Sequence, residues 1–190
     1  MNFRENHWLS EGLTIYLLMK YIEVNYPNQK LIGNLSDMPI IKNYSISKLG
    51  FNESFMIYSE LMVRRNLHQI ATTPKDLLIK FNERIATPYQ VGVLFRYLEN
   101  YIGKDIFEAI LKEIYKVKNI EDLKLIISKY SSNIDANNFI KYLDSIHTLD
   151  IQITDVIESN NQISVITDQF SNQNIPYEVA LVKDNRIIDS

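Results

Sequence analysis

Residues 8–27 read WLSEGLTIYLLMKYIEVNYP, and this stretch predicts a largely apolar helix. From Ser10 onward the apolar side chains surround most of a helical projection, so we expect burial on more than one side. Pro27 ends the helix, because proline lacks a backbone N–H and clashes with the preceding turn. The stretch therefore predicts a helix over residues 10–26 that packs against several neighbours.

Helix start and stop signals recur along the chain. The clearest is Thr87-Pro88-Tyr89-Gln90, which offers a threonine N-cap, a proline at the first helical position and a glutamine that closes a capping box. Gly103 then serves as a C-terminal cap. A long structured loop is expected over residues 27–50. The signals predict further helices over residues 52–67, 75–85, 87–102, 105–117, 119–130 and 136–146.

The periodicity changes near residue 148. Apolar and polar residues approximately alternate over 149–156, and shorter runs follow over 163–166 and 177–181, as is typical of strands. Asp184-Asn185 predicts a hairpin turn. We expect a helical subdomain over residues 1–147, and over residues 148–190 three or four strands that open an antiparallel sheet or sandwich. The predicted fold class is mainly α, a helical array followed by a short antiparallel β segment.

The composition excludes several classes of protein. The 190 residues are 46% hydrophobic and carry a net charge of -3, so we expect a globular core and no basic field for nucleic acid. The absence of cysteine rules out disulfides and thiolate metal sites. No stretch approaches the roughly 20 uninterrupted apolar residues of a membrane span, and the start MNFRENHW lacks the features of a signal peptide.

Two motifs resemble those of one enzyme family. Residues 8–12, WLSEG, and residues 11–17, EGLTIYL, are similar to the WLNEG turn and the EGxTVYL helix of gluzincin aminopeptidases of the aminopeptidase N and leukotriene hydrolase family. Residues 88–92, PYQVG, resemble the PYEKG turn of that family, which opens a helix ending in LLG, matched here by residues 101–103. The order and coarse spacing agree over most of the chain. The resemblance implies the C-terminal, helical half of such a catalytic domain and the first strands of its neighbouring β-sandwich.

The resemblance also implies roles for two residues. Glu11 matches the third protein ligand of a catalytic zinc, and Tyr89 matches a tyrosine that donates its hydroxyl to the oxyanion of the tetrahedral intermediate. The histidine ligands of the family come from an HExxH helix roughly twenty residues upstream of the glutamate, and this sequence has no HExxH. We therefore expect zinc and a peptide substrate only where the missing half is supplied, and no hydrolysis by the isolated chain. An exposed apolar face is expected where that half would dock, with self-association or a bound partner as the consequence.

Some positions depart from the family pattern. Counted back from Gly103, the family spacing assigns the tyrosine position to Pro88 rather than to Tyr89, and Val91 replaces a lysine. These departures favour an alternative function, a non-catalytic helical scaffold that binds a peptide or a partner's helix near Glu11 and Tyr89. A degraded gene product without a selected function is the remaining alternative.

The same side chains have plainer interpretations. A glutamate near a helix start commonly complements the positive end of the helix dipole, as Glu11 would. Tyr89 is one of 12 tyrosines and suits the margin of a core. His7 lies one helical turn before Glu11, and we interpret it as a surface imidazole rather than a metal ligand.

Overall fold

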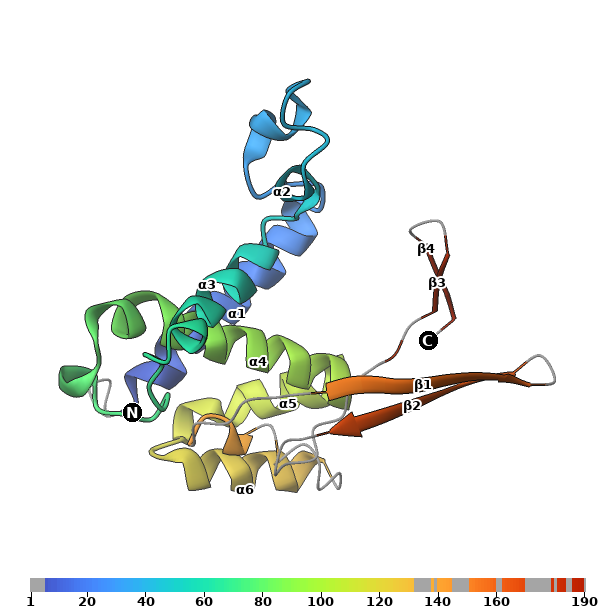
Figure 1. Cartoon of the computed structure of the whole chain (residues 1–190). Coiled ribbons are helices and arrows are strands. Elements are labelled where there is room, and N and C mark those ends of the chain that lie inside the picture. The colour runs from blue at the N-terminus through green and yellow to red at the C-terminus, as the bar shows by residue number, and fades with distance from the viewer. Residues whose placement is uncertain are drawn as a thin grey trace.

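The computed structural model describes residues 6–131, 138, 140–144, 151–159, 162–169, 179, 181–183 and 186–189. It is mainly helical, with short antiparallel strands towards the C-terminus, which confirms the predicted fold class (Figure 1). The helices are α1 (His7–Asn25), α2 (Ser45–Lys48), α3 (Glu53–Arg64), α4 (Thr87–Ile102), α5 (Lys104–Glu113) and α6 (Ile120–Tyr130). The strands are β1 (Ile151–Ser159), β2 (Gln162–Gln169), β3 (Leu181–Lys183) and β4 (Arg186–Asp189). Within these ranges no helix has both the length and the apolarity that crossing a bilayer requires.

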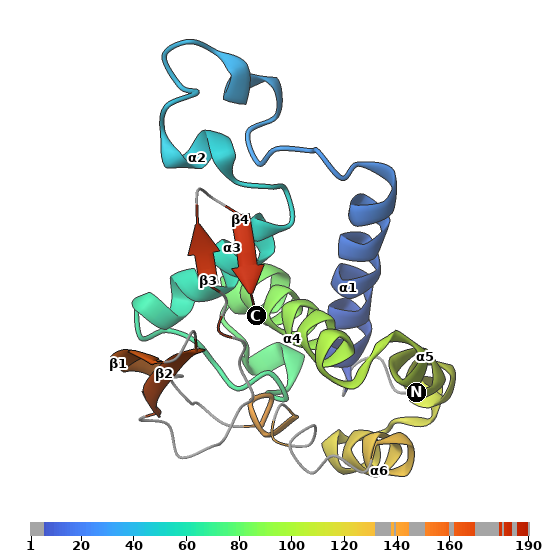
Figure 2. The ribbon, with the colours of Figure 1, turned by 90° about the vertical axis from the view of Figure 1, so that its right-hand side faces the viewer.

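The segment between α1 and α3 extends away from the other helices and then returns to them (Figure 2). It contains a 3₁₀ turn, Gly33–Asp37, followed by α2. An antiparallel bridge between Lys30 and Gly50 closes its base. These hydrogen-bonded turns confirm the prediction of a long structured loop over residues 27–50.

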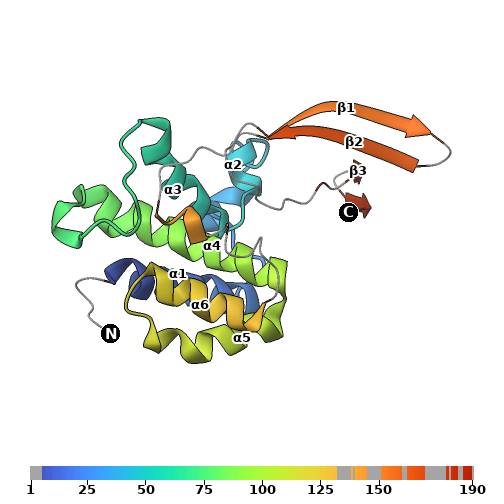
Figure 3. The same cartoon turned by 90° about the horizontal axis from the view of Figure 1, so that it is seen from below.

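The core lies where α1 and α4 meet α5 and α6, which lie next to each other (Figure 3). From α1 it receives Trp8, Leu9 and Tyr16, and the ring of Tyr16 packs edge-on against Phe107 with 5.2 Å between centroids. The other helices add the buried side chains Phe95, Leu98, Ile110, Leu123 and Ile127. The predicted burial of the opening helix is thus confirmed for its first half, whereas Leu17, Tyr21 and Val24 in its second half are exposed.

α1 and α4 cross at two glycines. A Cβ atom added to Gly12 would lie 2.5 Å from Cβ of Val91, and one added to Gly92 would lie 2.7 Å from Cβ of Ile15. Carbon atoms that are not bonded approach to roughly 3.5 Å at closest, so neither position has room for a side chain. Both glycines belong to the motifs that carry the family resemblance. They bring Glu11 close to the beginning of α4.

α4 does not begin at the predicted cap. The chain is already helical at Lys80, passes through a π-helical turn over Asn82–Ala86 and continues into α4. Thr87 has helical backbone angles and its side chain caps nothing, so the predicted N-cap is wrong. Pro88 explains the irregular turn, because it has no N–H to donate to the carbonyl of Arg84 and its ring would clash with that carbonyl in a regular α-helix.

Two other predicted helix ends are confirmed. At the start of α6, Asn119 Oδ1 accepts a hydrogen bond from the N–H of Asp122 at 3.0 Å, and Asp122 Oδ2 accepts one from the N–H of Lys118 at 2.8 Å. At the end of α4, Gly103 has φ of 91°, a conformation that side chains disfavour. The predicted helix over residues 136–146 lies mostly outside the described residues, as does the predicted domain boundary after residue 147.

The strands form two separate sheets. β1 pairs only with β2 and β3 only with β4 among the described strands, each pair antiparallel. The strands and their antiparallel pairing agree with the predicted antiparallel segment, and the described strands form two hairpins rather than one continuous sheet. The predicted turn residues Asp184 and Asn185 lie outside the described residues.

Acid is expected to weaken the contact between α5 and α6. Hydrogen bonds from Lys129, then from Tyr130 and Lys116, hold the pKa of Glu113 at about 2. Because this folded pKa lies below the roughly 4.3 of a free glutamate, the stabilisation is complete above about pH 4.3 and is lost as the pH falls towards 2. The measurement is the thermal midpoint between neutral pH and pH 2 for the parent chain and Glu113→Gln.

The difference between those midpoints should shrink with falling pH. Glu108→Gln is the control, since Glu108 is an exposed residue that meets only Lys104, at 3.7 Å, among the ion pairs of the described residues. A pH-independent difference for Glu113→Gln would contradict the assignment.

Candidate functional site

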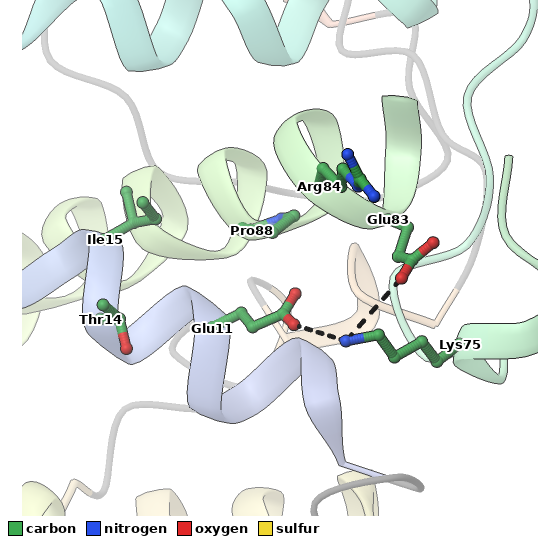
Figure 4. Close-up of a pocket in the computed structure, with 7 residues that line it drawn as sticks. All are labelled: Glu11, Thr14, Ile15, Lys75, Glu83, Arg84 and Pro88. Carbon is green, nitrogen blue, oxygen red and sulfur yellow. Dashed lines mark hydrogen bonds and ion pairs between the residues drawn. The ribbon is translucent and has the colours of Figure 1, made fainter. Parts of the chain in front are cut away.

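Glu11 lies on the wall of an open groove with a cavity volume of about 330 Å³ (Figure 4). A groove of this size suits a short peptide segment or a small ligand. α1 contributes one wall, and the opposite wall comes from the π-helical turn and the first residues of α4. The lining residues are Glu11, Thr14, Ile15, Lys75, Glu83, Arg84 and Pro88.

Lys75 lies between the two carboxylates of the groove (Figure 4). Its Nζ is 3.1 Å from Oε1 of Glu11 and 3.8 Å from Oε1 of Glu83. A hydrogen bond donated by Lys80 lowers the pKa of Glu83, with the charges of Lys80 and Lys75 acting in the same direction and burial opposing them. Glu83 is therefore ionised at neutral pH, and a cation already lies beside Glu11.

The groove provides only part of a zinc site. A catalytic zinc of this type takes three protein ligands and one water, whereas the lining residues include two carboxylates and no histidine. Among the described residues, no group of three or more His, Asp or Glu side chains is arranged to hold a metal ion. The described part of the chain therefore does not fit a catalytic zinc by itself.

Tyr89 does not face the groove. Its ring packs edge-on against Phe55 of α3, with 4.9 Å between centroids, and also meets the ring of Tyr58 at 6.3 Å. The preceding residue, Pro88, lines the groove together with Glu11. Consecutive residues of an α-helix point about 100° apart, so a helix that turns Pro88 towards the groove turns Tyr89 away from it. The spacing counted from the end of α4, which assigns the tyrosine position to Pro88, agrees with this arrangement.

His7 is buried rather than on the surface, so that prediction is wrong. Its exposed fraction is 2%, and the adjacent Trp8 and Leu9 are equally buried. The reason is that α1 begins at His7, several residues before the predicted start at Ser10, and its first turn enters the core. The side chain is not among those that line the groove with Glu11.

The sequence did not identify Lys75, Glu83 and Arg84 as site residues. Lys75 belongs to a single 3₁₀ turn, Lys75–Leu77. Its partner Glu11 is 64 positions away in the sequence. The helix predicted over residues 75–85 is present only from Lys80 onward, so the predicted start at residue 75 is wrong. Glu83 and Arg84 come from the π-helical turn, for which Pro88 is the only sequence signal, and charged residues near a helix start usually face water.

A second polar cluster joins α1 to α4. The carboxylate of Glu99, only 3% exposed, accepts hydrogen bonds from Lys20 Nζ at 3.0 Å and from Arg96 Nη1 at 2.6 Å, while Arg96 Nε donates to Glu23 at 3.0 Å. Burial raises the pKa of Glu99, but the hydrogen bonds and charges of Lys20 and Arg96 outweigh it and lower the pKa overall. Burial and the adjacent Glu99 raise the pKa of Tyr16. Both oxygens of Glu99 are occupied, so this cluster holds the two helices together.

No protein-family model, curated protein or solved structure matches this chain. The resemblance to gluzincin aminopeptidases therefore depends on the motifs at residues 8–17 and 88–103, and it stays a prediction. The groove beside Glu11 is the structural feature to which that prediction refers.

Proposed function

We propose that this chain is the helical part of a gluzincin-type zinc aminopeptidase site, in which Glu11 is the carboxylate ligand of the metal. The observation that carries the proposal is the position of this carboxylate on the wall of an open groove, where it is accessible to a ligand. A glutamate that only complemented the helix dipole would need no groove. The crossing at Gly12 and Gly92 supports the proposal, because it brings the two motifs of the resemblance together.

The chain is not a catalyst by itself in this proposal. Glu11 offers one ligand, and the histidine ligands and the general base must be provided by an HExxH-bearing segment. Lys75 would have to move away from Glu11 before a metal ion could take its place. Thr14, Ile15 and Pro88 offer a mixed polar and apolar wall for a peptide substrate.

A second candidate function is a non-catalytic scaffold that binds a peptide in the same groove. Two contacts favour it: the ion pair that Lys75 forms with Glu11, and the packing of Tyr89 against Phe55 of α3. The groove presents two carboxylates and two cationic side chains, which could pair with the charged groups of a peptide. Under this function Glu11 would bind an ammonium group rather than a metal.

Zinc retention distinguishes the two functions. The chain is mixed with the purified HExxH-bearing half of an active gluzincin aminopeptidase, and zinc in the complex is measured after gel filtration. We expect one zinc ion per complex for the parent chain, and Glu11→Gln should weaken zinc binding by at least about tenfold because it removes one of three protein ligands. The same assay records cleavage of aminoacyl substrates, which should be absent for the chain alone.

Glu83→Gln is the matched control, because Glu83 lines the same groove and also meets Lys75. It should leave zinc retention unchanged. Equal zinc affinity for Glu11→Gln and the parent chain would favour the scaffold, and zinc-dependent cleavage by the isolated chain would show that it provides a complete site.

A further inference from the structure

The hairpin of β1 and β2 extends away from the helices (Figure 1). Its register shifts between Ile153 and Asp155, which marks a β-bulge in β1. In a regular strand these two residues would point to the same side, because side chains alternate with a period of two. The bulge inserts one residue, so that Ile153 shares a face with Val156 instead. The irregularity therefore gathers apolar side chains that strict alternation would separate.

Strand pairing completes this face. Val156 pairs with Val165, and residues that pair across an antiparallel ladder point to the same side. The face that we call the apolar face carries five apolar residues together with Glu158 and Thr167; the apolar residues are Ile151, Ile153, Val156, Ile163 and Val165. Ile153 and Val156 are 60% and 57% exposed. The opposite face is more polar and carries Gln152, Asp155, Ile157, Ser164, Ile166 and Asp168.

Charge indicates which partner suits the apolar face. Glu158, paired with Ile163 next to the turn, is the only charged side chain on its described part. A strongly charged partner would find no opposite charges on this face, whereas a partner surface that is equally uncharged would match it. The same face of a second copy meets this requirement. When the two-fold axis is perpendicular to the strands, the turn end of one hairpin meets the open end of the other, so the two Glu158 side chains stay apart.

The area of the face sets the strength of such a contact. β1 has 9 residues, so the hairpin is about 30 Å long and roughly 10 Å wide, which is on the order of 300 Å² per copy. A stable interface buries roughly 800 Å² per partner. The contact is therefore weak and forms only at high protein concentration. It also stabilises the hairpin, because two isolated strands are marginal in water.

We infer that the apolar face of β1 and β2 docks onto the same face of a second copy of this chain. The two hairpins form the layers of a small four-stranded sandwich, with Val156 and Val165 near its centre. This interface is independent of the groove beside Glu11.

Sedimentation equilibrium from micromolar to millimolar concentration tests the inference. The mass should rise from 22.3 kDa towards twice that value. Val156→Lys places a charge at the centre of the interface and should raise the concentration needed for association by at least about tenfold. Ile157→Lys is the matched control, since it adds the same charge on the opposite face of the same strand and should shift that concentration by less than about twofold.

Cross-linking gives an independent test that tolerates some loss of hairpin structure. The chain has no cysteine, so Val156→Cys introduces a single thiol. A bismaleimide that spans roughly 10 Å, the separation of packed sheets, should link two copies through it, whereas Ile157→Cys should stay unlinked. A parent chain that remains monomeric at every concentration, or equal effects of the two lysine variants or of the two cysteine variants, would overturn the inference.

Discussion

Arg96→Met is expected to lower the free energy of unfolding by about 3 kcal/mol, the lower end of the range for removing one partner of a buried ion pair. The loss arises because Glu99 is only 3% exposed and would keep a single cation, Lys20. A methionine of similar length retains the apolar contacts of the arginine stem. The measurement is chemical denaturation at neutral pH.

The control for this prediction is Arg64→Met. Arg64 also forms an ion pair within one helix, at 2.8 Å to Glu60, but its side chain is 76% exposed. Exposed pairs contribute roughly 0.2 to 1 kcal/mol, so this variant should be nearly as stable as the parent chain. Adding Glu99→Gln to Arg96→Met should recover part of the lost unfolding free energy, because it removes the buried negative charge that Arg96 no longer neutralises. Equal losses for the two arginine variants would mean that the Glu99 cluster does not stabilise the α1 and α4 contact.

Gly12→Ala and Gly92→Ala should each lower the free energy of unfolding by about 2 kcal/mol. Two effects oppose each other here. Alanine is the better helix former by about 1 kcal/mol, but its methyl group would lie 2.5 Å from Cβ of Val91 at Gly12 and 2.7 Å from Cβ of Ile15 at Gly92. Overpacking of this kind costs roughly 1 to 3 kcal/mol and sometimes more. The measurement is the thermal midpoint of unfolding. It should fall if overpacking is the larger effect and rise if helix propensity is the larger effect.

Gly50→Ala is the control for the glycine variants. A Cβ atom at Gly50 would meet its nearest neighbour, Oε1 of Glu53, at 3.7 Å, an ordinary van der Waals distance. This variant should be as stable as the parent chain. If Gly12→Ala or Gly92→Ala stabilised the protein, as helix propensity alone suggests, the close approach of α1 and α4 would be wrong.

Local signals in the sequence predicted much of the fold. The cap at Asn119, the glycine at position 103 and the apolar run after Trp8 each act within a few residues, and the structure contains the helices that they predict. The start of α4 was missed because a π-helical turn accommodates Pro88 within a continuous helix. The local rules for helix caps do not anticipate such a turn. The strands were predicted, but the sequence pattern does not specify whether the second strand also pairs with the third, so it could not predict two separate hairpins.

The candidate site was only partly accessible from the sequence. The motif around Glu11 indicated a functional carboxylate, and this residue does line a groove. The motif around Tyr89 indicated a phenol beside the same groove, yet the ring packs against α3. A shift of one residue along α4 separates the two arrangements, and only the spacing counted from Gly103 hinted at it. Lys75 could not be predicted, because its contact with Glu11 depends on how distant segments fold together.

The crossing of α1 and α4 at Gly12 and Gly92 determines where the protein can adapt to a ligand. At this crossing the β-branched side chains of Val91 and Ile15 lie directly against the backbone of Gly12 and Gly92. Such side chains are restricted at χ1, so these contacts leave little freedom for the separation of the two helices to change. Glu11 and Pro88 should therefore keep their separation as a ligand enters. Any induced fit must then occur in the short turns that carry Lys75, Glu83 and Arg84. These turns form the part of the groove wall that can move relative to Glu11 and Pro88.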